Sequence, residues 1–300
     1  MRFSRSITPM GRYIRHLFIF TSFLILCRCA FPAESTTHPF QGVTHICWNK
    51  PAPDPQEAHI VLIALDTHGL RFTTTPSNGP DAPRETWCET TFEFVKKTGA
   101  QIGINANYFI YDKESHTELI GLAASDGTVV SPWDKSISRY ALNITRDNKA
   151  VFVVRPENAE GTVLTQPPTD LYNAVSGRPM LLRDGTVLVE EVGERHPRTG
   201  IGITRDNKLM LFVADGRQPS HSVGMTFYEM ATVMREHGAA DALALDGGGS
   251  STLVFADPDP RVVNVPMPTE LPVDMGLQAP GFERPNGNNL VVFVPEKGNE

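Results

Sequence analysis

The sequence lacks the short motifs that mark several common enzyme classes. It contains no glycine loop ending in Gly-Lys-Ser/Thr, no His-Glu-x-x-His, no Cys-x-x-Cys pair and no Gly-x-Ser-x-Gly. Nucleotide hydrolysis, zincin proteolysis and serine esterase chemistry therefore lose their usual support.

Positive charge is also scarce. The 300 residues include 27 basic and 34 acidic ones, a net charge of -7, which argues against binding of nucleic acid by bulk positive potential.

Cysteine is rare, and half of it lies near the N-terminus. Of four cysteines, Cys27 and Cys29 fall within the first 33 residues, which leaves Cys47 and Cys88 in the rest of the chain. In a protein that matures in an oxidising compartment, two such cysteines are candidates for pairing. We expect a disulfide between Cys47 and Cys88, with two free buried thiols as the alternative.

The first 33 residues lack acidic side chains but hold five arginines, four of them before an apolar run from Leu17 to Cys27. That run is shorter than the roughly 20 residues that cross a bilayer. Residues 1–33 are therefore predicted to be a signal peptide, the only part in contact with a membrane, and the protein to be secreted or periplasmic. A lipid-modified Cys27 or Cys29 is the competing interpretation. Without the five arginines the chain has a net charge of about -12. An anionic ligand must therefore be held by local groups against the overall negative charge.

Apolar strands separated by tight turns recur from residue 60 onward. Each of the four turns pairs residues that tolerate a positive φ, as two-residue hairpins require. They are Asp126-Gly127, Asp147-Asn148, Asp184-Gly185 and Asp206-Asn207. Four hairpins predict a sheet-rich protein rather than a helical bundle.

Two helices are predicted from their end signals. Thr90 with Glu93, and Thr226 with Glu229, form capping boxes, and the helices end at Gly99 and Gly238. Apolar strands over 209–214 and 241–245 flank the second helix, a βαβ-like order. We predict the α+β class, with one mixed domain built on β-hairpins and a few packed helices over residues 60–296, preceded by an N-terminal extension over 34–59.

The strongest candidate site is a glycine-rich turn after an apolar strand. Asp246 ends the strand and is followed by Gly247, Gly248, Gly249, Ser250 and Ser251. Unshielded backbone amides beside a carboxylate can hold an anion or admit a ligand closely. A tight turn capped by Asp246 is the alternative. Three glycines, however, lose much conformational entropy on folding, so a purely structural turn would hardly need all of them.

Three further segments carry candidate polar groups. Asp215 and Arg217 follow another apolar strand, and if the strands ending at Asp215 and Asp246 are neighbours, their carboxylates share one edge of the sheet, as in glycosidases. Arg198 follows a proline that fixes the backbone, and its guanidinium suits phosphate or carboxylate. Asn105 lies in an apolar segment, where its amide must bind the backbone or a sugar hydroxyl. Each segment alone is equally consistent with ordinary structural pairing.

Taken together, these segments resemble the phosphodiester glycosidase family, which has many secreted bacterial members. The resemblance rests on LDGGGSSTLV, HPRTGIGI, VADGR, GRPMLLRDG and INANYF, which occur here in the family's order and cover roughly residues 60–294. The sequence departs from the family pattern at Ala106, Asn107 and Arg178, and in the segment from Glu283 to Asn288. These departures leave the core pattern intact and concern the choice of substrate.

The resemblance implies a secreted glycoside hydrolase that cleaves a sugar-1-phosphodiester at the anomeric carbon and releases sugar and a phosphate monoester. Asp246 and Asp215 are the expected catalytic carboxylates, with Asp215 alternatively an orienting group. The expected substrate and phosphate ligands are Asn105, Arg198, Arg217, Gly247, Gly248, Gly249, Ser250 and Ser251. No cofactor is required; a divalent cation is compatible with the aspartates, although no ligand spacing demands one.

The expected partner is a carbohydrate phosphodiester or glycan substrate, not nucleic acid. Two other functions are weighed against this one. They are a non-catalytic binder of envelope or exopolysaccharide carbohydrate, and a glycosidase that acts on polysaccharide without phosphate. The aspartates favour an enzyme over a binder, and the arginines favour a phosphorylated substrate.

Overall fold

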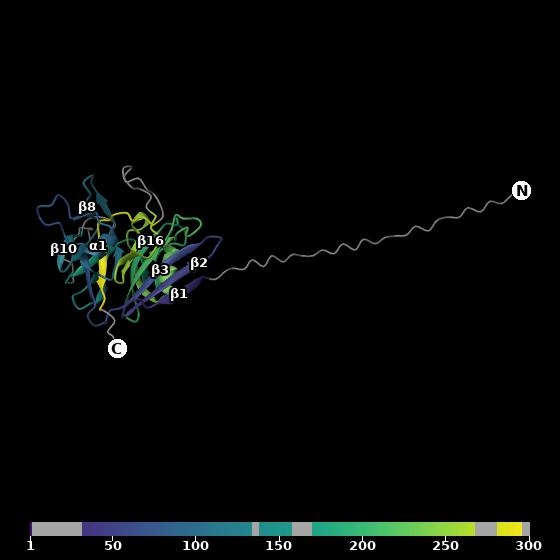
Figure 1. Cartoon of the computed structure of the whole chain (residues 1–300), viewed down its shortest axis with the longest axis horizontal. Helices are drawn as coiled ribbons and strands as arrows, with labels where there is room; N and C mark the ends of the chain where they lie inside the picture. Colours follow the sequence, from purple (N-terminus) through teal and green to yellow (C-terminus); the bar gives the residue numbers. More distant parts are fainter. Residues whose placement is uncertain (2–31, 134–137, 158–169, 268–280, 296–300) are drawn as a thin grey trace. The chain divides into compact units, whose positions relative to one another are not determined.

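The computed structural model describes the chain except for residues 2–31, 134–137, 158–169, 268–280 and 296–300 (Figure 1). Nearly all of the predicted signal peptide lies outside the described residues. Within them, no helix is long and apolar enough to span a membrane. Phe31–Glu300 forms one compact unit.

An eight-stranded antiparallel sheet is the largest element of the fold. Its order is β1-β2-β3-β17-β16-β18-β14-β15. The strands are β1 (Ala33–Thr37), β2 (Val43–Lys50), β3 (Gln56–Ala64), β14 (Met180–Arg183), β15 (Thr186–Val187), β16 (Arg198–Thr204), β17 (Lys208–Ala214) and β18 (Ala239–Ala244). Residues 34–59, predicted as an extension, supply two of these strands and the start of a third.

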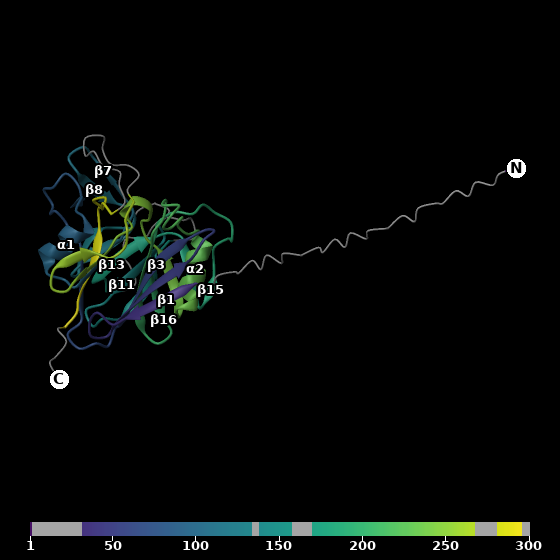
Figure 2. The ribbon, with the colours of Figure 1, turned by 45° about the vertical axis from the view of Figure 1, so that its right-hand side comes forward.

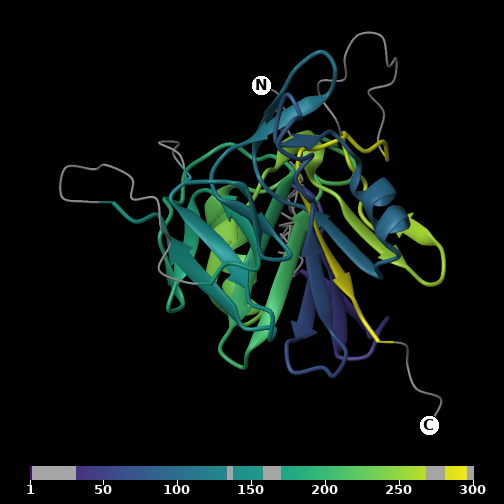
Figure 3. The same cartoon turned by 90° about the vertical axis from the view of Figure 1, so that its left-hand side faces the viewer.

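Three smaller antiparallel sheets accompany the large one (Figures 1 and 3). The first has the order β10-β9-β13-β11-β12, with β9 (Ala123–Ser125), β10 (Thr128–Ser131), β11 (Tyr140–Ile144), β12 (Ala150–Val154) and β13 (Asn173–Gly177). The second has the order β20-β19-β6-β21-β4, with β4 (Arg71–Thr74), β6 (Ile102–Asn105), β19 (Leu253–Ala256), β20 (Pro260–Val262) and β21 (Asn289–Phe293). The third has the order β5-β8-β7, with β5 (Thr86–Trp87), β7 (Phe109–Tyr111) and β8 (His116–Leu119).

The main core lies between the large sheet and the two five-stranded sheets. Val61 and Leu211 from the large sheet cluster with Ile104 and Leu290 of one smaller sheet and with Leu142 of the other. All five side chains are buried. This burial of apolar area, worth about 25 cal/mol per Å², holds the three sheets against one another.

The helices begin where the capping boxes predict. Helix α1 (Thr91–Thr98) has Thr90 as its N-cap, and Gly99 ends it at φ 73°. Helix α2 (Phe227–Glu236) has Thr226 as its N-cap. Apolar residues of α1 pack on the sheet that contains β6, and those of α2 pack on the outer face of the large sheet (Figure 2). The two described α-helices within a sheet-rich unit confirm the predicted α+β class.

All four predicted hairpin turns are present. They join β9 to β10, β11 to β12, β14 to β15 and β16 to β17. The turn residues Asp126, Asn148, Asp184 and Asn207 have φ values of 47°, 60°, 50° and 58°. Asp and Asn tolerate this left-handed region better than most residues, which is why the sequence located these turns.

The strands that flank α2 are not neighbours, although the expected shared edge for Asp215 and Asp246 depended on their being so. Strand β16 lies between β17 and β18 and pairs with both in antiparallel fashion. The two outer strands are therefore parallel to each other. Asp215 and Asp246, which follow their carboxyl ends, consequently leave the sheet at the same edge.

The predicted disulfide is absent. Cys47 and Cys88 are free thiols. Cys47 lies on β2 of the large sheet, whereas Cys88 follows β5 of the three-stranded sheet. The expectation was wrong because the fold places these two positions in different sheets.

Candidate active site

The glycine turn crosses the start of β16 at close range. A Cβ atom on Gly247 would lie 2.8 Å from the carbonyl oxygen of Pro197, and Gly248 adopts φ 61°. A short 3-10 turn, Gly248–Ser250, follows. Both glycines are therefore required for backbone reasons, one by the close approach and the other by its left-handed conformation.

The carboxylate of Asp246 is the buried acid of this turn. The residue is 8% exposed, and Arg284 Nη2 lies 3.2 Å from its Oδ2. Ser250 and the Gly247 amide also bond to the carboxylate. Burial raises the pKa of Asp246, and the Arg284 cation and these hydrogen bonds oppose that rise.

The turn uses part of its own hydrogen-bonding capacity. The Gly247 amide bonds to the Asp246 carboxylate, and the Gly248 amide donates to the Pro197 carbonyl at 2.9 Å. Ser250 Oγ is within bonding distance of Arg284 Nε at 3.2 Å. The expected phosphate cradle of three amides is thus reduced, because two of them are occupied within the protein.

Asn105 lies behind the turn rather than in an open cavity. Its Nδ2 donates to the backbone carbonyl of Asp246 at 2.6 Å. Its Oδ1 accepts from Thr199 Oγ1 at 2.9 Å and from the Thr252 amide at 3.1 Å. Asn105 is fully buried, and it joins β6, β16 and the glycine turn. The sequence predicted Asn105 as a substrate ligand, whereas its contacts indicate that it fixes the position of Asp246.

Arg198 and Arg217 come together at the turn. The Arg198 guanidinium lies over the Phe227 ring at 3.9 Å, and its Nε donates to the Met225 carbonyl at 2.8 Å. A Cβ on Gly248 would lie 3.2 Å from Nη2 of Arg217. Burial, reinforced by the positive charge of Arg217, lowers the pKa of Arg198. The Arg217 guanidinium and the Arg198 backbone thus both lie beside the turn, and two nearby cations suit an anionic ligand.

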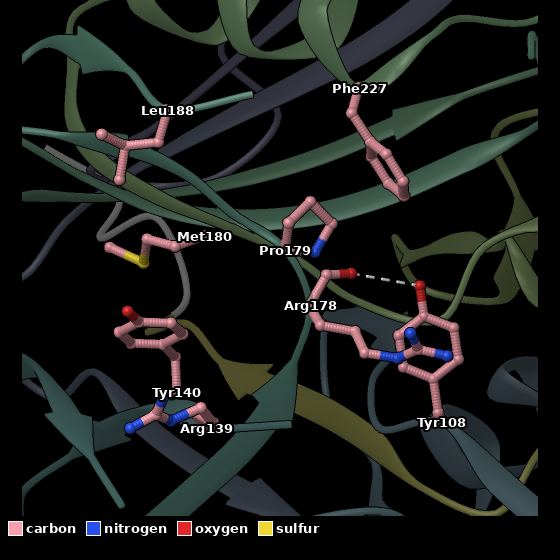
Figure 4. Close-up of a pocket in the computed structure, with 8 residues that line it drawn as sticks. All are labelled: Tyr108, Arg139, Tyr140, Arg178, Pro179, Met180, Leu188 and Phe227. Carbon is pink, nitrogen blue, oxygen red and sulfur yellow. Dashed lines mark hydrogen bonds between the residues drawn. The ribbon is translucent and has the colours of Figure 1, made fainter. Parts of the chain in front are cut away.

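Tyr108 connects the turn to a neighbouring cleft. Burial and the Asp246 charge raise the pKa of Tyr108 to about 12, against the opposing effect of Arg178 and Arg198. Its hydroxyl donates to the Arg178 carbonyl at 3.3 Å (Figure 4). A cleft of about 570 Å³ opens here. Its lining consists of Tyr108, Arg139, Tyr140, Arg178, Pro179, Met180, Leu188 and Phe227.

Sequence reasoning missed three members of this group as site residues. They are Tyr108, Arg178 and Arg284. Each lies either in a segment that carries the family resemblance or in the segment from Glu283 to Asn288 that departs from it, so the sequence did contain a signal for these positions. The partnership of Arg284 with Asp246, however, joins residues 38 positions apart, and spacing along the chain does not reveal it.

Asp215 is buried and is not among the residues that line the cleft. Its side chain has no exposed surface, and His221 Nε2 lies 2.8 Å from Oδ2. The Asn264 amide and the Val265 backbone amide donate to the carboxylate at 2.9 Å and 3.0 Å. Asn264 also donates to the Ser251 carbonyl at 3.0 Å. These contacts favour the orienting role over direct contact with a substrate.

Three side-chain groups in the described residues have the composition of metal sites. They are Cys47 with Glu57 and His59, Glu57 with Asp215 and His221, and Asp112 with Glu114 and His116. In the last group the Asp112 carboxylate is engaged by His116 at 3.0 Å and by Arg84 at 3.2 Å. None of the three includes Asp246.

Comparisons with known proteins show which family the chain belongs to. The phosphodiester glycosidase family pattern matches residues 98–293. N-acetylglucosamine-1-phosphodiester alpha-N-acetylglucosaminidase from Mus musculus is 29% identical over 175 residues, covering 52% of this chain and 32% of that protein. The Homo sapiens enzyme of the same name is 26% identical over 202 residues, covering 61% and 37%. The matches thus span about a third of the length of these relatives.

Two solved structures share the fold. The catalytic domain of the zebrafish enzyme of that name, auto-inhibited by its pro-peptide, aligns with a TM-score of 0.58 and 20% identity, covering 88% of this chain and 83% of that one. A hypothetical protein from Synechocystis aligns with a TM-score of 0.63 and 15% identity, covering 88% and 64%. The family pattern itself covers well over half of the sequence, and the chain therefore belongs to the phosphodiester glycosidase family.

Proposed function

We propose that this protein is a secreted hydrolase that cleaves a sugar-1-phosphodiester, of the N-acetylglucosamine-1-phosphodiester type, at the anomeric carbon. The observation that carries the proposal is a buried carboxylate, Asp246, with Arg198, Arg217 and Arg284 around the same glycine turn. In a chain with a net charge of -7, such a concentration of cations is a local feature that suits a phosphorylated substrate.

The chemistry needs little help from a general acid. When the bond between the anomeric carbon and the phosphate oxygen breaks, the electron pair leaves with a phosphate monoester, which is a good leaving group. The transition state instead gains negative charge on the departing phosphate. Arg198 and Arg217 are placed to stabilise that charge, and fixed cations in a partly buried site do so more strongly than water does.

Asp246 is the proposed base or nucleophile. In one route its carboxylate takes a proton from water while the water oxygen bonds to the anomeric carbon; in the other it bonds to that carbon and water later hydrolyses the adduct. Both routes need the ionised form. Arg284, at 3.2 Å, favours that form against the effect of burial.

The adjoining cleft is the proposed sugar site. It shares Tyr108 with the surroundings of Asp246, and Phe227 is the ring on which Arg198 lies. Its volume of about 570 Å³ is large enough for a sugar unit. The apolar faces of Tyr140 and Phe227 offer surfaces for the C–H face of a sugar ring (Figure 4).

Asp215 is proposed as a positioning residue in place of a second catalytic carboxylate. Its buried side chain bonds to Asn264, which in turn bonds to Ser251 of the turn. This chain of contacts supports the turn. No reaction step is assigned to a metal ion.

One experiment separates this function from its rivals. The purified protein is incubated with a panel of sugar-1-phosphodiesters and neutral aryl glycosides, and the released sugar is measured. Hydrolysis of the phosphodiesters alone supports the proposal. Hydrolysis of the neutral glycosides alone identifies a glycosidase without phosphate specificity, and hydrolysis of neither identifies a carbohydrate-binding protein.

A further inference from the structure

A group of metal-binding side chains lies on the large sheet, apart from the proposed catalytic carboxylate. Cys47 of β2 and His59 of β3 are directly paired across the two strands. Glu57 precedes His59 by two positions, so its side chain leaves the same face of the sheet. One ligand atom from each of the three residues lies within 4.8 Å of the others.

His59 gives independent evidence for a ligand. The residue is only 4% exposed, and its Nε2 has no hydrogen-bond partner among the described residues. That nitrogen points at the other members of the group, 3.8 Å from Glu57 Oε1. A buried nitrogen without a partner is costly, and a metal ion bound at this point would satisfy it.

The other ring nitrogen of His59 is already held. His45 Nε2 lies 3.1 Å from His59 Nδ1, and the two rings are stacked with centroids 5.3 Å apart. Metal-binding histidines typically have their second nitrogen fixed by such a neighbour, which sets the tautomer and the ring orientation.

We propose that Cys47, Glu57 and His59 form a zinc-binding site. Thiolate, imidazole and carboxylate ligands together suit Zn²⁺ better than Ca²⁺ or Mg²⁺, which prefer oxygen alone. Tetrahedral zinc with bonds of about 2.0 to 2.3 Å places its ligand atoms roughly 3.3 to 3.6 Å apart. Cys47 Sγ and His59 Nε2 lie 3.9 and 3.8 Å from Glu57 Oε1, and all three ligand atoms lie within 4.8 Å of one another. A contraction of at most roughly 1 Å therefore brings them to zinc-binding distances.

Zinc binding releases the proton of the Cys47 thiol. The Cys47 thiol now donates to Glu57 Oε1; when the Zn–S bond forms, that proton leaves to solvent. Cys47 and Glu57 are only partly buried, which gives the ion a path from solvent. The fourth coordination position belongs to water.

The site has a structural consequence for the turn described above. The Glu57 carbonyl accepts from the Asp215 amide at 3.0 Å, and Asp215 connects through Asn264 to Ser251. Zinc at Glu57 therefore stabilises the strand ends that support the glycine turn. The inference itself does not depend on the proposed hydrolase activity, because its test measures metal binding.

The test uses the reduced full-length chain with Cys27 and Cys29 replaced by Ser in every sample, stripped with a chelator. Zinc affinity and stoichiometry are measured by competition with a chromogenic chelator, and Co²⁺ is added separately as a spectroscopic probe. We expect one equivalent of zinc, and a thiolate-to-cobalt charge-transfer band in the near ultraviolet. Cys47→Ser should abolish the band, and Cys88→Ser, which removes the other thiol of the described residues, should leave it unchanged.

Two histidine variants test the ligand and its support. His59→Gln should abolish stoichiometric zinc binding, and His45→Phe, which keeps the stacked ring, should weaken it about 10- to 100-fold. Far-ultraviolet circular dichroism checks that each variant folds. A wild-type cobalt complex without the thiolate band, no stoichiometric zinc in the wild type, or equal zinc affinity in the two serine variants overturns the proposal, whichever histidine variants fold.

Discussion

Arg284 Nη2 lies 3.2 Å from Asp246 Oδ2, and the two residues reach this contact from separate segments of the chain. Asp246 lies two residues after the end of β18 in the large sheet, whereas Arg284 precedes β21 of a smaller sheet. The ion pair therefore brings together the edges of two sheets. Burial raises the pKa of this carboxylate, and the adjacent cation opposes that rise.

Replacing Asp246 with Asn tests the proposed chemistry directly. The amide keeps the size of the side chain but cannot act as base or nucleophile, so kcat on a sugar-1-phosphodiester should fall roughly 10²- to 10⁴-fold. Asp184→Asn is the matched control, since Asp184 lies in an exposed hairpin turn at φ 50° that Asn also tolerates. Full activity in Asp246→Asn would refute the assigned role.

Replacing Arg284 with Met should change the pH dependence of the reaction. Without the cation, the pKa of Asp246 rises further, and the carboxylate is protonated at pH values where the wild type is ionised. The acidic limb of the kcat/KM profile should move upward by about one to three pH units. Arg284→Lys retains the charge and should show a smaller displacement. An unchanged acidic limb in Arg284→Met would show that this ion pair does not govern activity.

Glu283 should make stability depend on pH. Burial raises the pKa of Glu283 to about 7, above its ordinary value of 4.5. The folded state thus binds the proton more tightly than the unfolded state does. Its contribution is fully present below about pH 4.5 and is lost as the pH rises to about 7, by up to roughly 3 kcal/mol.

The Glu283→Gln variant isolates this effect. Its side-chain oxygen can still accept from the Phe92 amide, as Glu283 does at 3.2 Å, but it does not ionise. Urea unfolding at pH 4.5 and pH 8 should show a smaller loss of stability in the variant than in the wild type. Glu114→Gln, at an exposed position, is the control. Parallel pH profiles for wild type and Glu283→Gln would contradict the prediction.

Truncating Asn105 to Ala should weaken both stability and activity. The change leaves the Asp246 carbonyl and the Thr252 amide without the side-chain partner that each now has. Each buried group left unsatisfied costs about 1 to 3 kcal/mol. The free energy of unfolding in urea should therefore fall by at least that amount, and kcat should fall because Asp246 is less firmly held. Wild-type stability would contradict the proposed bracing role.

The turns and helix ends were predictable because their causes are local. Thr90 and Thr226 bind amides three residues away, and Asp126 and Asn207 tolerate the positive φ that their hairpins need. The position of β16 between β17 and β18 was not predictable in this way. It depends on which strand completes the hydrogen bonding of its neighbours across the sheet.

The candidate site likewise has some features that follow from contiguous residues and others that depend on packing. The Asp-Gly-Gly-Gly-Ser segment, by itself, determined where the turn lies and that it carries Asp246, because a strand end and glycine freedom are properties of contiguous residues. The tertiary structure decided that Asn105 and Asp215 support the turn from buried positions, that Arg284 pairs with Asp246, and that Tyr108 lies within range of the Asp246 charge. It also placed Cys47 opposite His59 and away from Cys88. Burial and partnership are set by residues far apart in the chain, so only packing of the sheets fixes them.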